Sequence, residues 1–160
     1  AAAGAGGIMN WMSAPVIRTN TLVANTPSGL HLESTTSSVW PLEVTSVMNN
    51  IIWQNEIYLS EEVVDGEYSI RYNDIQGGWS GTGNLDVDPL FADAQNDDYH
   101  LKSQAGRWDP TTESWVLDDV TSPCIDAGNP STSYSKEPSP NAKRVNMGAY
   151  GGTGQASKSP

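Results

Sequence analysis

The sequence predicts an all-β protein: a short parallel β-helix (β-solenoid) with an irregular C-terminal cap. The apolar runs are short, rich in β-branched residues and bounded by Asn, Gly, Ser or Pro, as strands are. Gly (15) and Pro (10) are frequent, and helical periodicity is nearly absent. A degenerate internal repeat is the third observation that predicts this fold. The 160 residues suffice for one domain, in which we expect coils over 1–78 and a loop-rich cap over 79–160.

The repeat consists of "NTLVAN" (20–25), "NIIWQN" (50–55) and "NDIQGG" (73–78), whose starts lie 30 and 23 residues apart. In a parallel coil, equivalent positions of successive coils stack along the axis. An aliphatic column therefore fills the interior, and an asparagine column stands at a corner, where Asn tolerates the left-handed backbone conformation. The interior column is predicted to be Leu22, Ile52 and Ile75, and the structural corner ladder to be Asn20, Asn50, Asn73, Asn25 and Asn55.

The individual strands are expected within four segments, 14–25, 29–34, 42–62 and 67–78. After residue 78 a glycine-rich loop interrupts the repeat, and Pro89 then removes a backbone donor that a central strand would need. The remainder is turn-rich, which is typical of a segment that closes a coil.

The charge balance excludes some partners. Asp and Glu outnumber Lys and Arg by 19 to 8, and the net charge of −11 repels nucleic-acid backbones and anionic lipid surfaces. No apolar run approaches the roughly 20 residues that a membrane span needs. Cys124 stands alone, so we expect a small core residue rather than a disulfide or a nucleophile. The start, "AAAGAGG", does not have the pattern of a signal peptide.

The ordered set "DPLF" (88–91), "YHL" (99–101), "SPCIDAG" (122–128) and "NMGAYGG" (146–152) resembles the C-terminal part of a known family. These are bacterial secreted right-handed parallel β-helix proteins with polymorphic outer membrane protein-like repeats. The resemblance covers residues 66–159 and implies a right-handed helix and an extracellular or cell-surface location, but no chemistry. It also implies a closing cap over the last coil, formed by Leu90, Phe91, Tyr99, Leu101, Ile125, Met147 and Tyr150.

No residue is assigned a catalytic role, and we expect the protein not to be an enzyme. Parallel β-helices that cleave polysaccharides need a carboxylate pair, or clustered Asp residues that bind Ca²⁺ beside a basic residue. Arg18 and Arg71 stand two residues before aligned asparagines, with Asp74 nearby, and we interpret both arginines as exposed surface residues.

Two weaker binding hypotheses remain open, and no cofactor is expected apart from the first of them. A low-affinity Ca²⁺ site is one, although its carboxylates lack the spacing of an EF-hand loop. Glycan stacking on tryptophan is the other, against the alternative that these rings are lids on the core. The residues concerned are Asp93, Asp97 and Asp98 for Ca²⁺, and Trp79, Trp108 and Trp115 for glycan.

The N-terminal end of the coil is expected to be open, because residues 1–17 contain no amphipathic helix or charged lid. Such an end is covered either by more coils of a longer β-helix or by another copy, which predicts a homo-oligomer through the open end. The expected function is therefore a secreted or cell-surface structural subunit of a head-to-tail extracellular assembly or filament. The alternatives are a carbohydrate-binding or polysaccharide-processing β-helix module, which would carry an exposed row of tryptophans, or an adhesin-like display domain.

Overall fold

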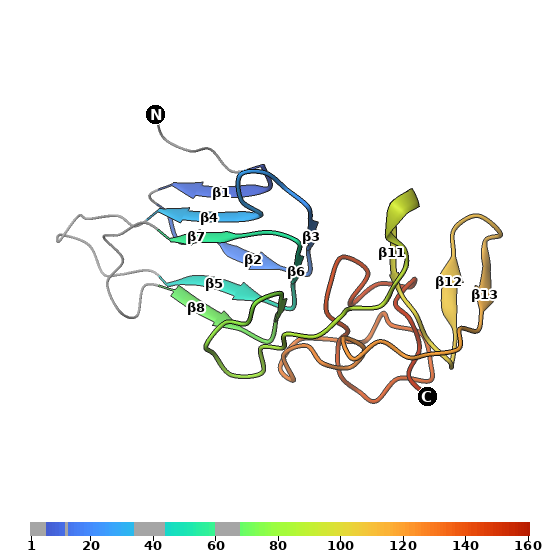
Figure 1. The fold of residues 1–160 in the computed structure, drawn as a ribbon. Coiled ribbons are helices and arrows are strands. Elements are labelled where there is room, and N and C mark those ends of the chain that lie inside the picture. Colours follow the sequence, from blue (N-terminus) through green and yellow to red (C-terminus); the bar gives the residue numbers. More distant parts are fainter. Residues whose placement is uncertain (1–5, 12, 34–43, 60–67) are drawn as a thin grey trace.

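The computed structural model describes residues 6–11, 13–33, 44–59 and 68–160, which form a stack of β-coils beside a loop-rich region (Figure 1). The expected strand segments that extend into 34–43 and 60–67 lie outside the described residues. Within the described ranges, the only helical element is the 3₁₀ turn η1 (Ala94–Asn96), too short to cross a membrane. The predicted class, an all-β short β-solenoid, is confirmed.

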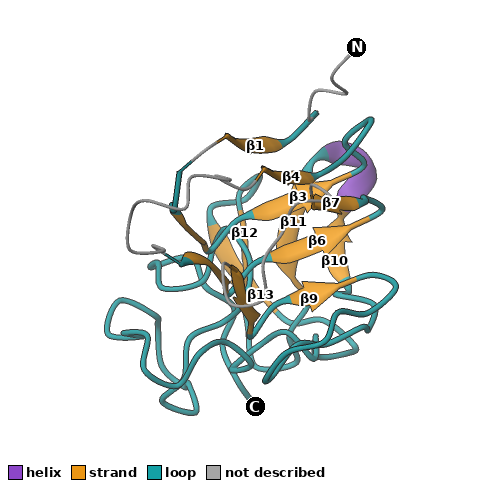
Figure 2. Ribbon diagram, turned by 90° about the vertical axis from the view of Figure 1, so that its left-hand side faces the viewer, coloured by secondary structure: helices purple, strands orange, loops and turns teal. Residues whose placement is uncertain are grey.

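The coils run through three parallel sheets, and each described coil passes from one sheet to the next. Parallel pairing follows from the winding, because every strand lies beside its equivalent one coil away. Figure 2 shows β3, β6 and β9 one below another. The sheets are β1 (Ile8–Trp11), β4 (Leu30–Glu33), β7 (Ile57–Leu59); β2 (Val16–Arg18), β5 (Thr45–Met48), β8 (Tyr68–Arg71); and β3 (Thr21–Val23), β6 (Ile51–Trp53), β9 (Asp74–Ile75).

The interior of the coils is an aliphatic cluster with contributions from all three sheets. Leu22 pairs with Ile52, and Ile52 pairs with Ile75, so one column of the cluster runs down the axis. Burying each such side chain contributes about 1.5–3 kcal/mol relative to exposure. The buried members are Ile17, Leu30, Leu32, Val47, Ile52, Ile70 and Ile75.

The last coil is closed by the loop that follows it. The backbone N–H of Tyr72 donates to the carbonyl of Thr82 at 2.9 Å, and that of Leu85 donates to the carbonyl of Asn73 at 2.7 Å. Trp79 packs against the interior cluster from this end. Residues 79–85 therefore occupy the edge that β8 and β9 would otherwise leave unpaired.

The region after residue 85 lies beside the stack rather than over its end (Figure 1). It contains two antiparallel pairs, β10 (Phe91–Asp93) with β11 (Asp98–Leu101) and β12 (Arg107–Asp109) with β13 (Ser114–Val116). Successive strand residues face opposite ways, so Ile51 points outward where Ile52 points inward.

Ile51 and the C-terminal region form a second cluster with buried Leu101, Cys124, Ile125 and Met147. The expectation that the cap residues cover the last coil is thereby corrected for Leu101, Ile125 and Met147, which pack with Ile51 on the outer face of the β3–β6–β9 sheet. Phe91 packs on the margin of this cluster, Tyr99 meets the Phe91 ring edge-on at 5.3 Å, and Tyr150 stacks on His100 at 3.6 Å. Leu90 is half-buried, with φ of 51°.

Candidate functional site

The corner asparagines form a hydrogen-bonded ladder along the stack. Asn50 Oδ1 accepts from the backbone N–H and from Nδ2 of Asn20, both at 3.0 Å. Asn73 Oδ1 accepts in the same way from Asn50, at 3.0 and 2.8 Å. The ladder continues to Asn84, which the sequence analysis missed, at 3.0 and 3.3 Å from Asn73. In the sequence, Asn84 is marked only by its position directly before the apolar Leu85. In the structure, the Leu85 backbone forms a parallel bridge with Asp74.

A shorter ladder runs along a second corner, where Asn55 Oδ1 accepts from the backbone N–H and Nδ2 of Asn25 at 2.6 and 3.2 Å. In both ladders the donors belong to the earlier coil and the acceptor to the later one. In the described chain, no donor reaches Oδ1 of Asn20 or of Asn25. The ladders thus have a direction, and their acceptors are unmatched at the first coil.

A polar groove lies at the corner that holds the shorter ladder. Its walls come from the turns that precede β4 and β7 and from the end of β9. Four of its lining side chains are amides, one is a carboxylate, and none is cationic, a set that suits hydroxyl-rich ligands. The lining residues are Asn25, Pro27, Gln54, Asn55, Glu56, Gln76 and Gly77.

The outer face of the β1–β4–β7 sheet carries an aromatic strip. Trp11 is 66% exposed, Tyr58 is 45% exposed, and Met9 lies in register with His31 and Tyr58. The His31 ring lies 4.4 Å from that of Tyr58, and His31 Nε2 lies 3.0 Å from Glu33 Oε1. Trp11 thus lies in register with Glu33, and Tyr58 lies in register with His31, which is only 3% exposed and contacts Glu33. We call Met9, Trp11, His31, Glu33 and Tyr58 the aromatic strip.

The groove and the aromatic strip are continuous along the chain. Glu56 lines the groove, and Tyr58, two residues later in β7, is also exposed. Trp11 and Tyr58 were not predicted as site residues from the sequence. The alternation of "LHLE" in β4 places His31 and Glu33 on one face, but it does not indicate Trp11 or Tyr58, and the polar Asn10 is buried in register with Leu32.

The three tryptophans proposed for glycan stacking do not form a row. Trp79 packs on the coil interior, whereas Trp108 and Trp115 pair across β12 and β13 with ring centres 5.6 Å apart. Lys158 Nζ lies 4.1 Å from the centre of the Trp115 ring. Sugar binding at these rings stays a prediction.

The acidic turn proposed for Ca²⁺ consists of carboxylates that each have a protein partner. Asp93 accepts from Asn96 Nδ2 at 2.6 Å, and Asp97 from the Tyr99 hydroxyl at 3.4 Å. Asp98 lies 2.6 Å from His100 Nδ1 and 3.4 Å from an Arg107 nitrogen; Arg107 also bonds Asp118. Among the residues that the structure describes, no three His, Cys, Asp or Glu side chains are placed to hold a metal ion. Calcium binding stays a prediction.

Arg18 and Arg71 lie on the outer face of the β2–β5–β8 sheet with Met48 between them in register, while Asp74 is buried in another sheet.

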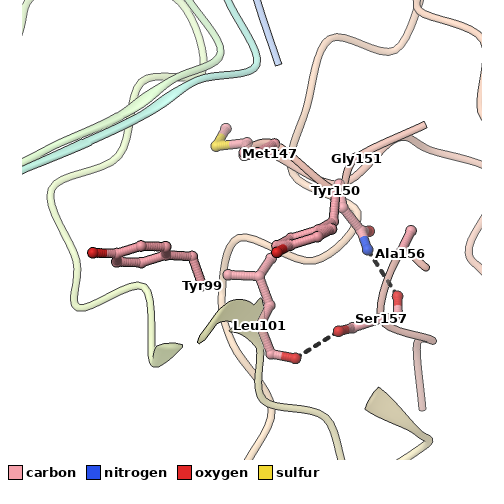
Figure 3. A pocket seen from close by; sticks show the side chains of 10 residues that line it. Tyr99, Leu101, Met147, Tyr150, Gly151, Ala156 and Ser157 are labelled. Atoms are coloured by element: carbon pink, nitrogen blue, oxygen red, sulfur yellow. Dashed lines mark hydrogen bonds between the residues drawn. The ribbon is translucent and has the colours of Figure 1, made fainter. Parts of the chain in front are cut away.

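A small cavity of about 10 Å³ lies between β11 and the last loops (Figure 3). It holds at most one water. Ser157 closes it by donating to the Leu101 carbonyl at 2.6 Å and accepting from Asn146 at 2.7 Å.

Buried carboxyls fasten the C-terminal region. Asp74 accepts from the Cys124 thiol and from the backbone N–H of Val87, both at 3.1 Å, and burial raises the pKa of Asp74. Burial likewise raises the pKa of Cys124, so this thiol is not a nucleophile at neutral pH. Glu137 Oε1 accepts from the backbone of Asn146 and Gly152, and burial raises its pKa too.

These two carboxyls predict a stability that falls as pH rises. When folding raises the pKa of a carboxyl group, the group stabilises the folded state fully at a pH below its unfolded pKa, ordinarily 3.8 for Asp74 and 4.5 for Glu137. This contribution to the free energy of unfolding is lost as the pH rises through the folded pKa. Each group contributes a slope of up to about 1.4 kcal/mol per pH unit in that window. Urea titrations between pH 4 and 8 measure it. The Asp74→Asn/Glu137→Gln double variant should flatten the profile; an unchanged slope in that variant contradicts the assignment.

A family model described as disaggregatase related matches residues 15–128, which is more than two thirds of the chain. The match spans the described coils from β2 onward, the closing loop and the first half of the C-terminal region. No curated protein and no solved structure matches the chain. The chain belongs to the disaggregatase-related family.

Proposed function

We propose that this chain is a non-catalytic module of a secreted or cell-surface protein, and that it binds polysaccharide along the aromatic strip and the adjoining groove. The observation that carries the proposal is the pair of exposed rings, Trp11 and Tyr58, on the same sheet face as the Glu33 carboxylate. The family description supports a role in assembled material, because disaggregation is the separation of such material.

The chemistry of the surface favours a neutral polysaccharide. Aromatic rings offer flat apolar faces to the C–H faces of pyranose rings, and carboxylates and amides bond hydroxyl groups. Glu33 and Glu56 supply the carboxylates, and no Lys or Arg belongs to the strip or the groove. Sulfated or uronic-acid polymers would meet uncompensated negative charge on a protein of net charge −11.

Glycan-array screening followed by affinity electrophoresis tests this function. We expect Trp11→Ala and Tyr58→Ala each to weaken binding at least about tenfold, as removal of a central aromatic anchor does. Leu117→Ala is the matched control, because Leu117 is 74% exposed and lies outside the strip and the groove. Equal binding by all three variants, or a preference for sulfated glycans, contradicts the proposal.

A structural subunit of an extracellular assembly or filament is the second candidate. The first coil favours it. The edges of β2 and β3 that face away from β5 and β6 have no strand partner in the described ranges. Unpaired edges promote association between chains. Size-exclusion chromatography with negative-stain microscopy tests it, and a monodisperse monomer at high concentration rules it out.

A further inference from the structure

We infer that the first coil is built to receive one more parallel β-coil, and that this coil carries two asparagines five residues apart. The inference concerns the end of the solenoid rather than its glycan-facing side, so it stands whether or not polysaccharide binds. It rests on the direction of the two asparagine ladders.

The acceptors at the first coil are incomplete in a specific way. Each asparagine oxygen further along, in Asn50, Asn55 and Asn73, accepts one backbone N–H and one Nδ2 from the coil before it. In the described residues, Oδ1 of Asn20 and Oδ1 of Asn25 receive neither donor, although both side chains are half-buried. Neither oxygen belongs to the buried unpartnered atoms of the described residues, so both are open at the end of the stack to a further pair of donors.

The spacing of the Asn20 and Asn25 oxygens determines which kind of coil can pair with the first one. Asn20 and Asn25 are five residues apart, and so are Asn50 and Asn55, whose Oδ1 atoms accept from Asn20 and Asn25. The received coil must therefore present two donor pairs with the same spacing. It must also place an aliphatic residue two positions after its first asparagine, as Leu22 and Ile52 do, to extend the interior column.

Neither end of a folded second copy meets these requirements. Two first coils brought together would set acceptors against acceptors. At the closed end, the backbone N–H of Asn84 donates to the Gly81 carbonyl at 3.3 Å, and the residue five positions later is Pro89, which has neither a backbone N–H nor a side-chain amide. The partner is therefore a β-solenoid coil with the Asn-x₄-Asn pattern, not the finished end of a second copy.

A coil copied from this chain tests the inference. Ile8 pairs with Leu30 at an offset of 22 residues. In the extended chain, a copy of residues 44–55 replaces residues 1–3. The second asparagine of the copy, equivalent to Asn55, then lies 22 residues before Asn25, which is the same offset. The matched control has both copied asparagines, Asn50 and Asn55, changed to Ala. Urea unfolding and hydrogen exchange are measured on the native chain and on both extended chains.

We expect the extended chain to have a folding equilibrium constant at least about tenfold larger than that of its control, because two side-chain hydrogen bonds are lost in the control. We also expect slower amide exchange over β2 and β3 than in the native chain. Equal stability of the extended chain and its control overturns the inference, and so does unchanged exchange at these strands.

Discussion

Asn50→Ala is expected to lower the free energy of unfolding by about 4 kcal/mol, because the Asn50 amide joins three coils in the buried interior. Its Nδ2 donates to the carbonyls of Ile17 and Met48 and to Asn73 Oδ1, at 3.1, 3.0 and 2.8 Å. Its Oδ1 accepts two N–H groups of Asn20, and the residue is 0% exposed. Urea denaturation monitored by circular dichroism measures the change.

Asn25→Ala is the matched control for this substitution. Asn25 stands at the start of the shorter ladder, is only half-buried, and donates its Nδ2 to the Val23 carbonyl and to Asn55 Oδ1, both at 3.2 Å. Because water can replace part of these bonds, we expect a loss of about 1 kcal/mol. Comparable losses in the two variants would show that the ladder does not hold the coils together.

Ile51→Ala is expected to cost about 3 kcal/mol and to loosen the C-terminal region selectively. Ile51 is 0% exposed and lies in the cluster of Leu101, Cys124, Ile125 and Met147 on the outer face of the β3–β6–β9 sheet. Its truncation leaves a cavity between the coils and the region beside them. Hydrogen exchange followed by mass spectrometry should show faster exchange over β11 and residues 122–152.

Ile52→Ala is the control for Ile51→Ala, since the two residues are adjacent and point to opposite sides of the same strand. Ile52 belongs to the coil interior, so its truncation should accelerate exchange over β3, β6 and β9 instead. The two substitutions remove the same atoms. Identical exchange patterns in the two variants would contradict the assignment of two separate clusters.

The coil part of the fold could be predicted because its signal is local and repeated. Three six-residue stretches carry Asn at the corner and an aliphatic residue two positions later, which sets both the sheet and its register. Parallel stacking then follows from equivalent positions lying one coil apart. The glycine-rich loop after residue 78 likewise marked where the coils end.

The position of the C-terminal region could not be predicted in the same way. "NII" contains two consecutive isoleucines, and nothing local tells which face of β6 is covered by residues far along the chain. Contacts such as Cys124 with Asp74, 50 residues apart, depend on the completed fold. A resemblance to closing caps suggested the wrong surface because it carried residue identities but no geometry.

The aromatic strip was missed for another reason. The strands that carry Trp11 and Tyr58, β1 with "IMNW" and β7 with "IYL", share no sequence pattern that aligns the two rings. Only the winding brings β1 beside β4 and β4 beside β7. Side chains that come together through winding alone leave no trace in linear spacing.

The sideways attachment of the C-terminal region fixes where the protein tolerates changes of length. That region contacts three successive coils, at Thr21 in the first, Ile51 in the second and Asp74 in the third. A duplicated winding inserted between Thr21 and Asp74 would separate these anchors and uncouple the two halves. The same insertion ahead of β2 would move none of them, so natural or engineered elongation is confined to that side.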